Sequence, residues 1–334
     1  WKGAGSTVID ASGFTNVGTV YMHSGTLDGF TITGGSGTKI SNWSYGGGIW
    51  AIGDNGRAAP IIIKNNVIAE NETCLNFVKV YWYQQCFGFG SGVMIHNTDN
   101  ATVENNLIVN NTNGKSAVYI SGANSAKILR NIISNNPGDT GITLERARDL
   151  TVDSTFFTKL DKTAILVQAN SWGTTITNSA FIGNRVAEII INYYDESLKL
   201  YNSTIAYNQK GNGYVLKLLS GSIIENSIIW DNARTIYNET YNLNGFAVSD
   251  GAQIINSIVE YGYTPESSIN VIDADPQFVN PEAGDFRLAS TSPALDSGSD
   301  LTSVGITTDI TGGSRPLDGN ANGVAEFDMG AFEQ

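Results

Sequence analysis

One short pattern recurs along the chain about every 24 residues. It consists of an apolar residue, a variable residue, Asn, a small or polar residue and then two or three apolar residues, and it occurs in the segments 63–68, 103–108, 176–181, 200–205, 224–229 and 255–258. Counted from Asn105, and through Arg130 and Asp153 at the same position, the successive intervals are 25, 23, 25, 24, 24 and 30 residues. Such regular self-similarity is typical of solenoids, in which each repeat stacks on the next.

Within the repeats, apolar residues alternate with other residues over short stretches, which indicates β-strands. Apolar residues at helical spacing are not sustained, so a stack of helices is a poor fit. A lap of about 24 residues with short strands fits one turn of a three-sided coil. We therefore predict an all-β fold, a right-handed parallel β-helix of about nine or ten coils over residues 1–268.

The best-defined strand of each repeat also predicts where its side chains point. Period-2 alternation directs these pairs into the interior: Val93 and Ile95, Val118 and Ile120, Ile142 and Leu144, Ile165 and Val167, Ile189 and Ile191. The residues between them, such as Met94, Tyr119 and Thr143, then point outward. Polar residues end these strands: His96, Ser121, Glu145, Gln168 and Asn192.

The recurrent asparagines are expected to be structural rather than catalytic. A second column lies six residues after the first, at Asn71, Asn111, Asn136, Asn184, Asn208 and Asn232. Stacked Asn side chains can hydrogen-bond from one coil to the next, and Asn tolerates the left-handed backbone of a tight bend.

Residues 269–334 depart from the repeat and form a separate tail. The tail contains Ser-Pro-Ala-Leu-Asp-Ser-Gly at 292–298, Asp-Gly-Asn-Ala-Asn-Gly at 318–323 and Asp-Met-Gly-Ala-Phe-Glu at 328–333. Tail and repeats together resemble the bacterial and archaeal right-handed β-helix surface proteins of the pectate-lyase-like superfold. The resemblance implies an extracellular or cell-surface protein whose tail caps the last coil. It implies no single activity, because this fold carries lyases, hydrolases, epimerases and adhesins.

The charge of the chain limits its partners. The formal net charge is −13, and no basic patch is visible, which argues against binding to nucleic acid. No run of 18 apolar residues is present, so the sequence predicts no membrane-spanning helix. The resemblance implies a polysaccharide as the partner. Self-assembly of the chain, or anchoring through further terminal segments, is the other kind of interaction to consider.

Three connections are longer than the repeat requires, at residues 35–46, 72–90 and 233–244. The first two contain the aromatic residues Trp43, Tyr45, Trp82 and Tyr83, which we expect to bind sugar rings by stacking. Gln168 and Tyr193, at or just beyond the ends of outward-facing strands, complete the predicted substrate-binding set. The alternative is that these rings pack a small satellite core under the loops.

Cys74 and Cys86 flank the aromatic part of the second connection. A disulfide between them is the prediction, and it would stabilise the fold by roughly 3 kcal/mol in the chain-entropy model. Two buried free thiols are the alternative.

The best cluster of ionisable residues is Glu145-Arg146-Ala147-Arg148, at the end of an outward-facing strand. His96 and Tyr119 should lie on neighbouring coils of the same face. Together these five residues, His96, Tyr119, Glu145, Arg146 and Arg148, are the predicted catalytic set, with His96 or Tyr119 as acid or base and the arginines as carboxylate-binding groups. The alternative is a surface network of Arg with Glu and Asp around a turn. Asn97-Thr98-Asp99 is similar to a triplet of polygalacturonases, but the partner motifs of that family are absent. The signatures of pectate lyases are absent as well.

The tail contains one candidate metal site. Asp318, Asn320, Asn322, the carbonyl of Val324 and Asp328 resemble a shortened calcium loop, because alternating oxygen donors suit a hard cation. An Asx-rich turn without calcium is the alternative.

Two functions remain open from the sequence. The leading prediction is an extracellular β-helix that binds a polysaccharide, with lyase action on uronic-acid glycans as the reaction to consider. The other is a non-catalytic structural or adhesive surface protein.

Overall fold

The computed structural model describes residues 7–53, 60–74, 87–185, 188–209, 215–232, 246–248, 251–262 and 265–334. Short strands make up nearly all of the regular structure. The helices in these residues are single 3-10 turns: η1 (Glu260–Gly262), η2 (Pro281–Ala283) and η3 (Thr302–Val304). No helix in this part of the chain is long and apolar enough to cross a membrane. The chain forms two compact units, Trp1–Leu150 with Phe157–Ser171, and Thr151–Phe156 with Trp172–Gln334.

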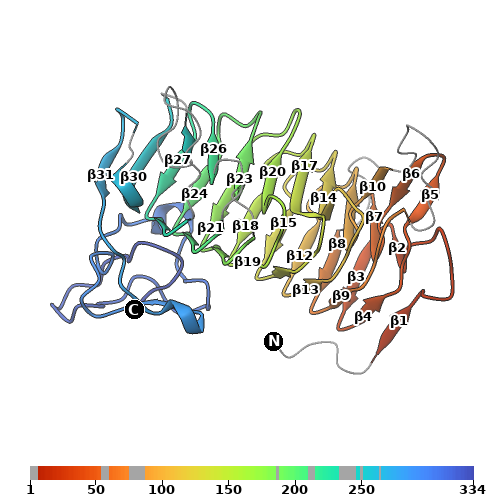
Figure 1. Ribbon diagram of the computed structural model, residues 1–334, viewed down its shortest axis with the longest axis horizontal. Helices are drawn as coiled ribbons and strands as arrows, with labels where there is room; N and C mark the ends of the chain where they lie inside the picture. Colours follow the sequence, from red (N-terminus) through yellow and green to blue (C-terminus); the bar gives the residue numbers. More distant parts are fainter. Residues whose placement is uncertain are drawn as a thin grey trace. The chain divides into compact units, whose positions relative to one another are not determined.

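In the first unit, one side of the coils is a sheet of parallel strands, which we name the first sheet (Figure 1). Its strands are β2 (Val20–Met22), β7 (Ile49–Ile52), β11 (Val93–His96), β14 (Ser116–Ser121), β17 (Thr140–Glu145) and β20 (Ile165–Val167). Pairing is in register, so that Met94 lies opposite Trp50 on one side and Tyr119 on the other. Equivalent positions of successive coils are therefore neighbours.

Two further columns of parallel strands complete the coils of this unit. One contains β3 (Gly25–Asp28), β8 (Ile61–Lys64), β12 (Thr102–Glu104) and β15 (Lys127–Leu129). The other contains β1 (Val8–Asp10), β4 (Thr31–Thr33), β9 (Val67–Ala69), β13 (Leu107–Val109) and β16 (Ile132–Ser134). Between the two columns the chain bends at Asn65, Asn105 and Arg130, whose φ angles are 56°, 51° and 54°. Asn suits this left-handed conformation better than most residues.

The interior of the coils is apolar, as the alternation predicts. The residues of the first four inward pairs are 0% exposed, as predicted. The prediction is wrong for Ile191, which pairs with the partly exposed Lys217, while Ile190 pairs with the buried Leu216, so the facing in that strand is shifted by one residue.

Asparagines stack inside the first unit in two columns. In the predicted second column, Asn71 Nδ2 donates to Asn111 Oδ1 (3.0 Å), and Asn111 Nδ2 donates to Asn136 Oδ1 (3.1 Å).

The predicted first column stacks as expected, since Asn105 Nδ2 donates to Asn65 Oδ1 at 2.7 Å. A further column, which is buried, lies one residue later. It consists of Asn66, Asn106 and Asn131, each 0% exposed. Asn66 Nδ2 donates to Asn106 Oδ1, and Asn106 Nδ2 donates to Asn131 Oδ1, both at 3.0 Å. The preceding Asn105 forms the bend itself and turns its side chain to the outside, because one residue further along the chain reverses the facing.

The first two long connections form a small sheet of their own, which we name the insertion sheet. It contains β5 (Thr38–Ile40), β6 (Trp43–Tyr45) and β10 (Phe87–Phe89), with β6 antiparallel to β5 and parallel to β10. Its rings cover the outward-facing Met94 and Tyr119, which are only 2% and 1% exposed. The aromatic residues of the connections therefore form, in part, a satellite core.

The second unit repeats the same arrangement. One column contains β18 (Thr151–Asp153), β21 (Thr175–Thr177), β24 (Lys199–Tyr201), β27 (Ile223–Glu225) and β30 (Gln253–Val259). The second contains β22 (Ala180–Ile182), β25 (Thr204–Ala206) and β28 (Ile228–Trp230). The third contains β23 (Ile190–Asn192), β26 (Leu216–Leu218) and β29 (Phe246–Val248). Strand β31 (Ile269–Ile272) pairs with β30, and β19 (Phe156–Thr158) lies where the chain passes between the units.

Serines continue the column of Asn66, Asn106 and Asn131 here, for example where Ser179 N–H donates to Ser203 Oγ at 3.2 Å. The other column stays asparagine, and Asn184 Nδ2 donates to Asn208 Oδ1 at 2.9 Å.

Nine strands equivalent to those of the first sheet occur in the described residues, six in the first unit and three in the second, close to the nine or ten predicted coils. The chain is thus an all-β parallel β-helix.

The tail folds beside the coils of the second unit (Figure 1). It begins with the hairpin of β32 (Phe278–Asn280) and β33 (Asp285–Leu288) and continues without long strands. Its apolar side chains contact successive coils: Met329 packs with Ile228 and Ile258, Phe327 with Tyr201, and Ala331 with Ala180. The tail thus packs along the flank of several coils of the second unit, that of β30 included.

Candidate functional site

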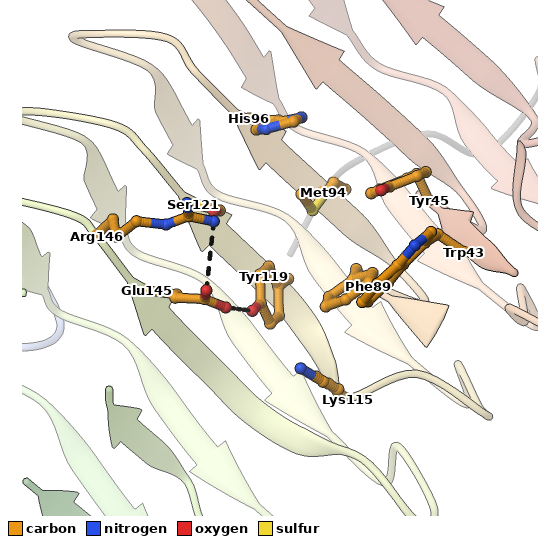
Figure 2. A pocket seen from close by; sticks show the side chains of 10 residues that line it. All are labelled: Trp43, Tyr45, Phe89, Met94, His96, Lys115, Tyr119, Ser121, Glu145 and Arg146. Carbon is orange, nitrogen blue, oxygen red and sulfur yellow. Dashed lines mark hydrogen bonds and ion pairs between the residues drawn. The ribbon is translucent and has the colours of Figure 1, made fainter. Parts of the chain in front are cut away.

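A pocket of about 280 Å³ lies between the outward face of the first sheet and the insertion sheet, within the first unit (Figure 2). Its wall consists of Trp43, Tyr45, Phe89, Met94, His96, Lys115, Tyr119, Ser121, Glu145 and Arg146. The in-register coils explain why distant residues meet here. His96, Ser121 and Glu145 occupy the same strand position on successive coils and are paired neighbours.

Aromatic rings form one side of the pocket. The ring of Phe89 is stacked between those of Trp43 and Tyr45, with centroid distances of 5.3 and 5.6 Å and interplanar angles of 24° and 16°. Tyr119 meets Phe89 edge-on at 4.9 Å. Phe89 is 7% exposed, whereas Trp43 is 41% exposed. Trp43 therefore offers ring surface to a ligand, and Phe89 supports it.

Charged groups line the rest of the pocket: Glu145 and Arg146 lie away from the stacked rings, and Lys115 lies beside Phe89 (Figure 2). The Tyr119 hydroxyl donates a hydrogen bond to the carboxylate of Glu145. The same carboxylate forms an ion pair with Arg146, 3.3 Å between Oε1 and Nη2. Lys115 Nζ lies 4.6 Å from the centre of the Phe89 ring, and no carboxylate of the described residues lies within 4.0 Å of it. Lys115 thus keeps its N–H donors available to a ligand.

The environment of the pocket alters the acidity of two groups. Burial raises the pKa of Tyr119, and the neighbouring Glu145 raises it further, so the phenol stays protonated at neutral pH. Burial lowers the pKa of His96, and the positive charge of Arg146 adds to this effect. The imidazole is therefore mostly neutral at pH 7. Its Nδ1 atom is buried and has no hydrogen-bond partner among the described residues.

A buried carboxyl group holds the segment that carries Lys115. Asp139 is 0% exposed, and its Oδ1 accepts the N–H of Gly114 at 2.9 Å, while the Ser91 hydroxyl donates to Oδ2. Burial raises the pKa of Asp139 to about 7. Gly114 directly precedes Lys115 in the chain. Its hydrogen bond to Asp139 therefore fixes the backbone that carries the lysine.

Six of the predicted residues meet in this pocket: His96, Tyr119, Glu145, Arg146, Trp43 and Tyr45. Arg148 does not line it. It lies on the next corner of the coil, where its N–H donates to the carbonyl of Ala123 (3.0 Å). Gln168 follows β20 and is also outside the lining, and Tyr193 belongs to the second unit. Trp82, Tyr83 and Cys86 lie outside the described residues, so the disulfide with Cys74 stays a prediction.

Four residues of the wall were not among the predicted site residues: Phe89, Met94, Lys115 and Ser121. Phe89 was expected only as one of the aromatic rings of the second connection, for sugar stacking or a satellite core. Ser121 and Met94 were assigned to the outward face by alternation, yet not to a site. Lys115 precedes β14 by one residue, and only its position directly before an outward-facing strand could have suggested a role.

The predicted calcium residues form two separate sets of contacts. Asp318 accepts the N–H groups of Asn322 (3.0 Å) and Gly323 (2.8 Å), and Asn320 Oδ1 also accepts from Asn322 (3.0 Å). Asp328 is 0% exposed, and its two oxygens accept the N–H groups of Asp296 and Gln334 at 2.8 Å. The first set has the contacts of an Asx turn, its acceptors directed at backbone amides. Calcium binding stays a prediction.

Comparison with known proteins agrees with the fold. The family model described as "Right handed beta helix region" matches residues 2–184 and 116–280. Among solved structures, the crystal structure of pectate lyase Pel9A is similar, with 16% sequence identity, a TM-score of 0.47, and coverage of 94% of this chain and 88% of that chain. No curated protein matches the sequence. The family match spans more than half of the chain, and the chain belongs to the right-handed β-helix family.

Proposed function

We propose that the first unit binds an acidic polysaccharide in the pocket between the first sheet and the insertion sheet, and that the chain is part of an extracellular or cell-surface protein. The observation that carries the proposal is the pairing of exposed ring surface with two cations. Trp43 is the exposed ring of the aromatic side, and Lys115 and Arg146 line the same pocket.

Each group has a role that sugar chemistry requires. The apolar face of a sugar ring stacks on an aromatic ring, whose rigidity keeps the entropic cost of binding low. A carboxylate on the sugar pairs with ammonium and guanidinium groups. The chain as a whole carries a formal net charge of −13, so an anionic polymer needs local cations of this kind.

The pocket also contains groups suited to β-elimination, in which a base removes the proton next to the sugar carboxylate and the bond to the leaving oxygen breaks. The neutral imidazole of His96 is the candidate base, and the protonated phenol of Tyr119 the candidate acid for the leaving oxygen. An adhesive protein would bind the same polymer and leave it intact. Cleavage is therefore measured separately from binding.

The proposal is tested by titration calorimetry with oligosaccharides of galacturonate. Lys115→Met and Arg146→Asn each remove one charge, and we expect each to weaken binding about tenfold, because a charged hydrogen bond contributes roughly 1.5–3 kcal/mol. Asn is chosen at residue 146 because its φ angle is 53°.

Arg148→Asn is the matched control, since it removes an equal charge two residues away and outside the pocket. Equal losses in Arg146→Asn and Arg148→Asn would mean that net charge alone governs binding, and the proposal would be wrong. Release of unsaturated products, lost in His96→Ala, would identify a lyase. Retained binding without products would identify an adhesive role.

A further inference from the structure

The second unit exposes a group of aromatic side chains that the pocket does not include. Trp172 is 41% exposed, Tyr193 48% and Tyr194 57%. They lie on two loops, one directly before β21 and the other directly after β23. We name these three residues the aromatic platform. Exposed rings are common singly, but three on adjoining loops suggest a binding surface.

Buried polar groups hold the two loops together. Asn192 and Asp195 are both 0% exposed. The Oδ1 atom of Asn192 accepts the N–H groups of Tyr194 (3.2 Å) and Asp195 (2.8 Å), which fixes the tight turn that carries both tyrosines.

Asp195 then connects this turn to the loop of Trp172. Its carboxylate oxygens accept the N–H of Gly173 at 3.2 Å and that of Thr174 at 2.8 Å. The loop with the tyrosines and the loop with Trp172 are therefore neighbours with a defined backbone, and little conformational entropy is lost when a ligand binds there.

A cation lies at the platform. Lys217, on β26, is paired with Ile191 of β23, and its Nζ atom is 4.1 Å from the centre of the Tyr193 ring. No carboxylate of the described residues lies within 4.0 Å of this ammonium group. The N–H groups of Lys217 that do not face the Tyr193 ring are therefore available to an anionic ligand.

We propose that the aromatic platform with Lys217 is a second binding site, for an anionic saccharide. The ring centres of Tyr193 and Tyr194 are 6.5 Å apart and the rings are inclined at 60°, so one sugar face stacks on Tyr194 alone, and the acidic group of the sugar pairs with Lys217 beside Tyr193. This site shares its ligand class with the proposed function of the pocket but none of its residues. A long chain bound at both sites would gain affinity, because the second contact becomes intramolecular.

The test is the stoichiometry with which the full chain binds a galacturonate trisaccharide. We expect about two molecules bound per chain, and about one in the double variant Tyr193→Ala/Tyr194→Ala, since loss of the stacking ring and of the ring beside Lys217 weakens a site about tenfold or more. Lys217→Met should weaken the same site. Tyr261→Asn is the control, because Tyr261 is 49% exposed in the same unit and Asn accepts its φ of 67°.

The two sites are told apart by Lys115→Met, which should weaken pocket binding about tenfold and leave platform binding unchanged. If Lys115→Met has no effect while the double tyrosine variant loses a site, the platform stands and the pocket proposal fails. The platform proposal is overturned if the double variant, with an unchanged circular dichroism spectrum, binds the trisaccharide with wild-type stoichiometry and affinity. Absence of any binding to the wild-type chain overturns it as well.

Discussion

At the scale of single residues, the buried asparagines carry the connection between coils. Asn106 uses its whole side chain: Oδ1 accepts from Asn66, and Nδ2 donates to the carbonyl of Ile63 (2.9 Å) and to Oδ1 of Asn131. Its backbone N–H also donates to Asn131 (3.0 Å). Such a group is costly to remove, because its partners are buried and would lose their hydrogen bonds.

We predict that Asn106→Ala lowers the free energy of unfolding by about 2–4 kcal/mol. The loss arises because the amide groups of Asn66 and the carbonyl of Ile63 stay buried without their partner. Urea unfolding followed by circular dichroism measures the change. Asn42→Ala, at an exposed position of the insertion sheet, should change stability by less than about 0.5 kcal/mol. Equal losses in the two variants would contradict the ladder.

The sequence showed that these asparagines are structural, but not which of two adjacent ones lies inside. Asn105 and Asn106 have the same side chain, so composition cannot separate them. The left-handed bend at Asn105 decides it, because that residue turns the chain and the next one then points inward. Where the pair became Asn202-Ser203, Asn202 forms the left-handed bend with a φ of 42°, and Ser203 continues the inner column, its N–H donating to Ser227 Oγ at 3.2 Å.

At the scale of elements, the insertion sheet forms the second wall of the pocket, opposite the outward face of the first sheet. Strands β6 and β10 lie over the first sheet, so that Phe89 contacts Tyr119 and the outward Met94 is buried. Alternation correctly placed Met94 and Tyr119 on the outer side. It could not show that they are covered, because the pairing of β6 with β10 joins segments about 44 residues apart in the chain.

The two phenylalanines of β10 provide a matched test of this packing. We predict that Phe89→Ala, at a 7% exposed position, lowers the free energy of unfolding by about 3–5 kcal/mol through lost burial and a cavity. Phe87→Ala, at a 45% exposed position, should cost less than about 1 kcal/mol.

Both variants are compared by urea unfolding and by near-ultraviolet circular dichroism, which reports on the packed rings. A small and equal effect of the two substitutions would mean that the insertion sheet contributes little to stability, contrary to the contacts of Phe89.

At the scale of the whole molecule, the repeat predicted most of the fold and about half of the site. In-register stacking places equivalent residues on neighbouring coils, so His96 and Glu145 could be assigned to one face from their strand positions. Stacking continues beyond the strand, where Arg148 pairs with Asn124 of the neighbouring coil, but the coil has changed direction at that corner and Arg148 does not line the pocket. Lys115 was missed because it lies before its strand, outside the stretch that alternates.

The tail shows a second limit of repeat logic. Its motifs predicted a separate segment, and its apolar residues Phe327, Met329 and Ala331 are buried against coils of the second unit. Which coils it would cover depends on contacts between residues more than 100 positions apart, such as that of Asn202 with the carbonyl of Asp328 (3.0 Å). No local pattern encodes such a contact.

A crystal structure of the chain with a galacturonate oligosaccharide is the most direct test of the pocket. We predict a sugar ring against Trp43 and a sugar carboxylate within about 3.2 Å of a nitrogen of Lys115 or Arg146. An oligosaccharide bound elsewhere in the first unit, with the wall of this pocket untouched, would contradict the proposed function.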